Sequence, residues 1–63
     1  MKTYTEATAQ LPSDAEWSAS FGNPGEGGYV EHHRRPSGEV WVVSNGPSYL
    51  HYTEFDWFAA KRA

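Results

Sequence analysis

Residues 29–44 read YVEHHRRPSGEVWVVS. Two runs rich in β-branched and aromatic residues, 29–33 and 39–44, enclose a turn-forming segment at 34–38 that contains Pro and Gly. This pattern predicts a β-hairpin with a loop at 34–38.

Further strands are expected on both sides of this hairpin. Residues 45–48 (NGPS) are a second turn signal, and residues 49–52 (YLHY) supply the next strand. Residues 22–28 hold four Gly and one Pro, which indicates a loop, and residues 17–21 (WSASF) before it are interpreted as a strand. The sequence therefore predicts an α+β fold built on a small antiparallel meander of three or four strands.

The strand at 39–44 is apolar on both sides. Side chains alternate along a strand, so Val40 and Val42 share one face while Trp41 and Val43 share the other. A sheet with two apolar faces needs two covers, and a chain of 63 residues can hardly provide both. We expect the second cover to be another molecule.

A short C-terminal helix over about 54–62 is expected to supply the first cover. Thr53 can cap its start and Asp56, three residues later, can return the hydrogen bond. Glu54 lies at the positive end of the helix dipole, and Lys61 and Arg62 lie at the negative end.

The N-terminal residues 1–13 are interpreted as a flexible tail or an edge strand. They are rich in Thr and Ala, with Tyr4 and Leu11 as the sizeable apolar side chains. Residues 14–63 are expected to form a single small domain.

Composition excludes several classes of protein. A chain of 63 residues cannot form a large enzyme fold, and a net charge of −3 has the wrong sign for direct binding of duplex DNA. There is no Cys, so neither a disulfide framework nor a thiolate zinc site is possible. No apolar run is long enough to span a membrane, and a cytoplasmic location is expected.

No metal, cofactor or catalytic site is predicted. His32 and His33 are adjacent on a strand and face opposite sides, so they cannot chelate one ion together, and His51 could join only one of them. Ser44, His51 and Glu31 could in principle meet across neighbouring strands, but their spacing does not require it. The glycines at 22–28 lack the Lys and Ser or Thr of a phosphate-binding loop.

The aromatic residues and a pair of arginines are the best candidates for contact with a partner protein. One set of helix rings can pack on the sheet and the other must be covered from outside, which selects Phe55 and Phe58 as binding hot spots. Trp41 can add an exposed ring on the sheet. Arg34 and Arg35, at the hairpin tip, can anchor a partner's carboxylates.

A series of short motifs runs through residues 15–61. They are Trp17 with Ser20, residues 27–31 (GGYVE), residues 40–44 (VWVVS), Gly46-Pro47, Leu50, Tyr52-Thr53 and Asp56-Trp57. In order and spacing they resemble the actinobacterial domain of unknown function 397 family. The chain resembles a divergent member, since Tyr29 stands where the family usually has Cys, residues 43–45 lack its Arg-Asp pair, and Ala60 replaces the usual Phe.

The resemblance implies a small non-enzymatic regulatory protein of the cytoplasm. Members are similar to antitoxin-like regulators that bind themselves, as a homodimer, and a helix-turn-helix transcriptional regulator encoded nearby. The alternative from the residues themselves is a small β module that binds single-stranded nucleic acid or proline-rich peptide through exposed Trp and Tyr side chains. A truncated fragment with no function of its own is the third interpretation.

Overall fold

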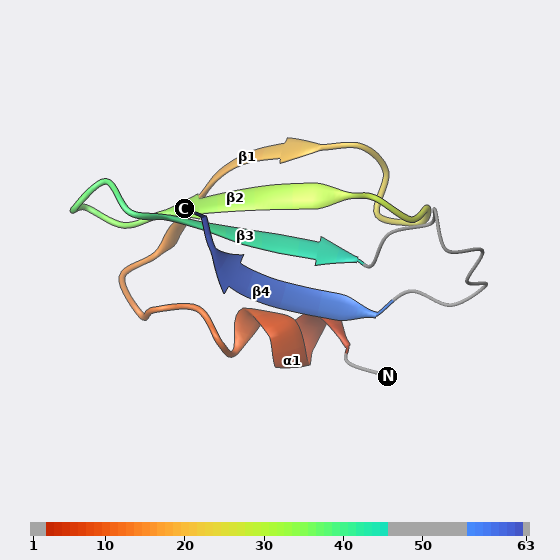
Figure 1. Cartoon of the computed structure of the whole chain (residues 1–63), viewed down its shortest axis with the longest axis horizontal. Coiled ribbons are helices and arrows are strands. Elements are labelled where there is room, and N and C mark those ends of the chain that lie inside the picture. The colour runs from red at the N-terminus through yellow and green to blue at the C-terminus, as the bar shows by residue number, and fades with distance from the viewer. Residues whose placement is uncertain (1–2, 46–55, 63) are drawn as a thin grey trace.

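The structure, a computed structural model, describes residues 3–45 and 56–62 (Figure 1). One short helix precedes four strands. In chain order these are α1 (Tyr4–Thr8), β1 (Glu16–Phe21), β2 (Val30–Arg34), β3 (Val40–Asn45) and β4 (Trp57–Lys61).

The four strands form one antiparallel sheet in the order β1-β2-β3-β4. This confirms the predicted meander and the hairpin at its centre, where Arg34 pairs with Val40. The turn closes through backbone bonds from Arg35 N to Glu39 O at 2.8 Å and from Gly38 N to Arg35 O at 2.9 Å. Gly38 has a φ of 94°, a conformation that other residues adopt only with strain.

The segment before the glycine-rich loop is a strand, as its residues predict, but it is not regular. Trp17 pairs with His33 and Ala19 pairs with His32, which leaves Ser18 as the extra residue of a β-bulge. The bulge reverses the alternation of side chains. Trp17 and Phe21 consequently lie on opposite faces of the sheet.

The predicted C-terminal helix is wrong, because Trp57–Lys61 form strand β4. Strand β4 pairs along all of β3, from Asn45 opposite Trp57 to Trp41 opposite Lys61. A helix of two and a half turns has little stability alone, whereas the ladder to β3 satisfies backbone groups along an apolar strand. Pairing with β3 therefore outweighs the local helix signals. Thr53, Phe55 and the predicted strand 49–52 lie outside the described residues.

The single helix lies instead at the N-terminus, where a flexible tail or an edge strand was expected. Thr3 is its N-cap, and a complete capping box links the side chains of Thr3 and Glu6 to each other's backbone N–H groups. Ala7 is fully buried against the sheet. The helix packs against β4 and β3.

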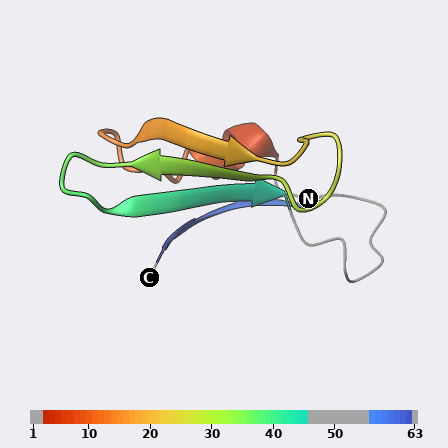
Figure 2. The ribbon, with the colours of Figure 1, turned by 90° about the horizontal axis from the view of Figure 1, so that it is seen from above.

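Helix α1 lies on one side of the sheet only (Figure 2). We name this side the covered face, and the strand registers place three cross-strand rows on it. The rows are Trp17-His33-Trp41-Lys61, Ser20-Glu31-Val43-Ala59 and Asn45-Trp57. Val43 and Asn45 are fully buried there.

Asn45 is the buried link between the sheet and the glycine-rich loop. Its Oδ1 accepts a hydrogen bond from Tyr29 N at 2.8 Å. Its Nδ2 donates to the carbonyl oxygens of Glu26 at 2.7 Å and Pro24 at 3.3 Å. Asn45 was interpreted as the start of a turn, but it is the last residue of β3 and supports the loop at 22–28 from inside.

We expect Asn45→Asp to lower the free energy of unfolding by about 2 kcal/mol or more. The carboxylate would face two backbone carbonyl oxygens that have lost their donors, and unsatisfied buried groups cost about 1–3 kcal/mol each. Asn23→Asp is the matched control, because Asn23 is exposed and uses only its Oδ1, which accepts from Gly25 N at 2.8 Å. Urea unfolding followed by circular dichroism compares the two, and equal stabilities would contradict this role of Asn45.

Candidate functional site

The side of the sheet opposite α1 carries apolar residues, and none of the described helices or strands lies over it. We name it the open face. Its two mainly apolar cross-strand rows are Phe21-Val30-Ser44-Phe58 and Ala19-His32-Val42-Ala60, and the next row of paired residues is Glu16-Arg34-Val40. Phe21 is 58% exposed and Phe58 is 42% exposed, so two large rings of this face remain in contact with water.

The rings of Phe21 and His32 are in contact on the open face. Their centroids are 5.4 Å apart with an interplanar angle of 66°, an edge-on arrangement. His32 lies between Ala19 and Val42 in the sheet. This contact restricts the position of the Phe21 ring at the β1 edge of the open face.

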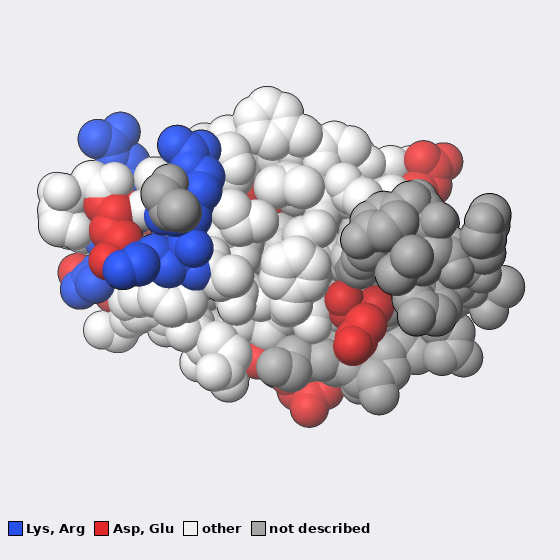
Figure 3. Space-filling view, in the orientation of Figure 1, with Lys and Arg blue, Asp and Glu red and all other residues white. Residues whose placement is uncertain are grey.

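Basic side chains gather at one end of this face. Arg34 pairs with Val40 at the start of β3, and the chain after β4 returns to the same place, since Arg62 N donates to Val40 O at 2.9 Å. In Figure 3 the Lys and Arg side chains cluster at one end with acidic side chains among them, uncharged residues fill the middle, and further acidic side chains lie toward the other end. The open face is therefore mainly apolar in the middle, and Arg34 and Arg62 lie at its Val40 end.

Arg35 is held by carboxylates of its own chain. Its Nε and Nη2 donate to Asp14 at 2.7 and 3.4 Å, and its Nη1 donates to Glu39 at 2.9 Å. Trp41 Nε1 donates to the same carboxyl of Glu39 at 2.8 Å, and Lys61 Nζ lies 3.9 Å from it. The hydrogen bonds from Trp41 and Arg35 lower the pKa of Glu39, and those to Asp14 and Glu39 raise the pKa of Arg35.

The structure separates the five predicted contact residues. Phe58 and Arg34 lie on the open face, whereas Trp41 lies on the covered face and joins Arg35 in the ion-pair cluster around Glu39. Phe55 lies outside the described residues. The sequence analysis missed Phe21 and Arg62, and Phe21 was hidden by the bulge at Ser18, which no residue pattern marks.

A buried carboxylate fastens α1 to the covered face. Glu31 is 7% exposed and accepts hydrogen bonds from Tyr29 Oη at 2.7 Å and from Tyr4 Oη at 3.0 Å. His33 Nε2 lies 2.9 Å from its Oε1. The ring of Trp57 packs edge-on against Tyr4 and Tyr29 at centroid distances of 5.0 and 5.9 Å.

These contacts change how the cluster titrates. Burial alone would raise the pKa of Glu31, but the hydrogen bonds from His33, Tyr29 and Tyr4 outweigh it and lower that pKa. The hydrogen bond that Tyr29 donates to Glu31 raises the pKa of the Tyr29 hydroxyl. Burial, followed by the same kind of bond, raises the pKa of Tyr4. The cluster is therefore most stable with an ionised Glu31 between two neutral phenols.

The described residues do not assemble the catalytic group that was considered from the sequence. Ser44 lies on the open face and donates to Tyr29 O at 2.6 Å, while Glu31 lies on the covered face. His32 and His33 also lie on opposite faces, as predicted. Within residues 3–45 and 56–62 no three His, Asp or Glu side chains are grouped so that they could hold a metal ion, and His51 lies outside these residues.

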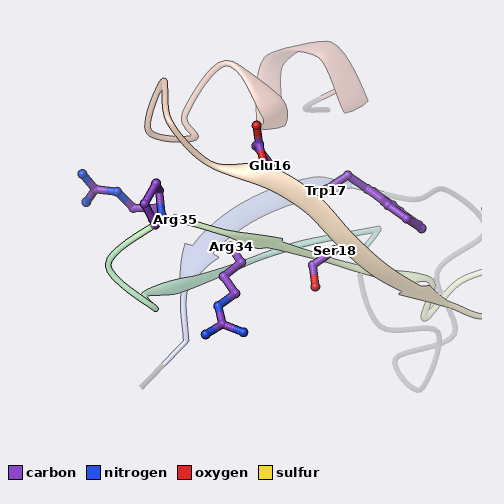
Figure 4. Close-up of a pocket in the computed structure, with 6 residues that line it drawn as sticks. Glu16, Trp17, Ser18, Arg34 and Arg35 are labelled. Carbon is purple, nitrogen blue, oxygen red and sulfur yellow. The ribbon is translucent and has the colours of Figure 1, made fainter.

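A hollow of about 330 Å³ lies where the start of β1 meets the hairpin turn. It is lined by Glu16, Trp17, Ser18, Arg34, Arg35 and Pro36. Figure 4 shows that Glu16 points toward the helix side, that Arg34 and Ser18 point the other way, and that Arg35 points outward. Its charged groups do not converge on one point, as the polar groups of a small-molecule site would.

No protein-family model, curated protein or solved structure matches this chain. The resemblance described above therefore stays a prediction from the residues. None of the helices described here is long and apolar enough to cross a membrane.

We expect the protein to lose stability in acid through Glu31. A lowered folded-state pKa gives stability that is present above the unfolded value of about 4.3 and is lost as the pH falls through the folded value. Thermal unfolding between pH 7 and pH 3, followed by circular dichroism, should show this loss. Glu31→Gln keeps an acceptor for the phenols and removes the titrating group, so its melting temperature should fall less over the same range. Parallel pH profiles of the two proteins would contradict the assignment.

Proposed function

We propose that this chain is a non-enzymatic regulatory protein that works by docking its open face on other proteins. Its expected partners are a second copy of itself and a helix-turn-helix transcriptional regulator. The observation that carries the proposal is the open face, where Phe21 and Phe58 stay 58% and 42% exposed, while α1 packs on β3 and β4 of the opposite face and leaves only Trp17, at its β1 edge, as an exposed large ring among the described strands.

The energy available on this face suits reversible binding. Fully burying a Phe or Val side chain gains about 1.5–3 kcal/mol, so the two Phe and three Val side chains could supply several kcal/mol in total. Association costs about 4–15 kcal/mol in lost freedom of motion, which leaves only a modest net affinity. A reversible partner fits this balance better than a permanent one.

The choice of a helix-turn-helix regulator rests on the family resemblance and on charge. Such regulators present basic surfaces to DNA, and this chain has a net charge of −3. An acidic protein is attracted to a basic surface and repelled by DNA, so it can compete for the regulator. Docking would change the regulator's affinity for DNA by the difference in contact energy between its free and DNA-bound states.

The hollow beside Trp17 favours a second candidate function, the binding of proline-rich peptide or single-stranded nucleic acid. Trp17 is 59% exposed, and Arg34 and Pro36 border the same hollow. An exposed ring next to a guanidinium can stack on proline or on a nucleobase. Quenching of tryptophan fluorescence by a proline-rich peptide or an oligonucleotide, lost in Trp17→Ser, would support this candidate over the first.

We expect Phe58→Ser to weaken self-association and regulator binding by roughly threefold to tenfold, because fully burying a Phe side chain is worth about 1.5–3 kcal/mol and 42% of Phe58 is still exposed. Trp17→Ser is the control on the opposite face, since it removes a large ring that is 59% exposed, against 42% for Phe58. Analytical ultracentrifugation measures self-association, and titration calorimetry with the purified neighbouring regulator measures heterologous binding.

Three outcomes of this comparison are informative. If binding is lost in Phe58→Ser but not in Trp17→Ser, the result supports docking through the open face. If binding is lost only in Trp17→Ser, the partner binds at the β1 edge of the covered face instead. A wild-type protein that stays monomeric and binds no regulator overturns the proposed function.

A further inference from the structure

We propose that the open face pairs with the open face of a second copy about a two-fold axis that crosses the strands, so that facing strands run in opposite directions. This inference rests on the proposed function and specifies its self-docking geometry. It is carried by the distribution of charge along the face and by the order of large and small residues within its rows.

The charges lie at the two ends of β3. Arg34 pairs with Val40 and Arg62 is bonded to it, so both belong to the Val40 end. Of the acidic residues at this end, Asp14 and Glu39 are bonded to Arg35, and Glu16, which pairs with Arg34, points toward the helix side (Figure 4). Two acidic residues belong to the Asn45 end, since Asn45 Nδ2 bonds to the carbonyl of Glu26, and Asp56 precedes the residue that pairs with Asn45. Six residues of β3 separate the ends by roughly 17–20 Å.

This separation selects between the two ways of stacking the faces. An axis parallel to the strands would set the Arg34 and Arg62 end of one copy on the same end of the other. An axis across the strands sets the Arg34 and Arg62 end of each copy on the Glu26 and Asp56 end of the other. Like charges facing each other in an interface are costly and opposite charges are favourable, so the axis across the strands is preferred.

The apolar rows fit the same arrangement. The central row has the small residues Ala19 and Ala60 at its two ends, so an axis through it sets each of them on its counterpart, with His32 and Val42 on their own counterparts between them. Phe58 lies two residues before Ala60 and Arg62 lies two residues after it, on the same face by strand alternation. Phe58 of each copy therefore meets the second copy's Arg62, and a guanidinium over a ring is a favourable cation–π contact.

The size of the face sets the expected affinity. Four strands about 4.8 Å apart, each with about five residues at about 3.3 Å, give a face of about 300 Å² in projection. Stable complexes bury about 800 Å² of accessible surface on each partner. We therefore expect a weak dimer, with a Kd on the order of micromolar or above.

Single cysteines can test this geometry cleanly, because the chain contains no Cys. Ala60→Cys and Ala19→Cys, each alone, should be joined to themselves by a short bismaleimide that spans the roughly 10 Å between stacked sheets. Ser37→Cys at the hairpin tip is the control, since the proposed axis carries the two tips to opposite ends of the dimer, and it should not be joined. Ultracentrifugation of the unmodified 63-residue chain, at concentrations up to about 1 mM to detect a micromolar Kd, runs beside the cross-linking.

The results separate the geometry from the proposed function. Efficient cross-linking of both alanine variants with themselves supports the proposed axis. Cross-linking only in a mixture of Ala19→Cys and Ala60→Cys means an axis along the strands, and cross-linking of one variant alone means pairing at a sheet edge. Either result overturns the geometry but leaves self-docking intact. A strictly monomeric wild-type chain overturns this inference, while binding to the regulator still decides the proposed function.

Charge inversion gives an independent measurement on the same dimer. Arg34→Glu places an acid where the pairing requires a base, and it should weaken self-association by roughly fivefold to tenfold at low salt. Adding Glu26→Lys should restore part of the loss. Unchanged self-association in Arg34→Glu would overturn the electrostatic part of the argument.

Discussion

The five-residue helix α1 cannot cover both sides of the four-stranded sheet. The exposure of the apolar side chains on the second side depends on this difference in size. Strand β3 is apolar on both faces, so covering one face leaves the other in water. The described elements supply a layer on one side of the sheet only. The exposed Phe21 and Phe58 are the direct consequence of this limit.

The covered face of this small protein is held together by hydrogen bonds to a buried charged group. Its centre is a carboxylate, Glu31, which accepts hydrogen bonds from phenols that come from α1 and from β2's N-terminal side. A buried carboxylate is expensive unless it is fully bonded, and here its donors include Tyr4, the first residue of α1. The position of α1 is therefore specified by directional bonds as well as by the burial of Ala7 and by the contact of the Tyr4 ring with Trp57. A polar anchor favours one orientation of the helix over the many that apolar contact alone would allow.

Much of the sheet could be predicted from the sequence because its signals are local. The turn at 34–38 and the alternating strands around it belong to one continuous segment, and the structure has both. Strand β4 could not be predicted, because residues 53–62 carry local helix signals and the preference for β3 arises only from pairing across the chain. The capping box at Thr3 and Glu6 was readable, but the small polar residues around it suggested a tail. The bulge at Ser18 and the inward role of Asn45 depend on neighbours that are distant in sequence, so no local pattern marks them.

The edges of the sheet narrow the ways in which the protein can associate. An exposed strand edge is a template for pairing with another chain, and proteins discourage this with bulges, short strands and charged side chains. Strand β1 carries the bulge at Ser18, and β4 has only five residues, ends in Lys61 and is followed by Arg62. Both described edges thus carry features that oppose strand addition, whereas the open face carries none beyond the charges at its ends. If the edges resist pairing and α1 occupies the β3 and β4 part of the opposite face, the open face is the surface through which association costs least.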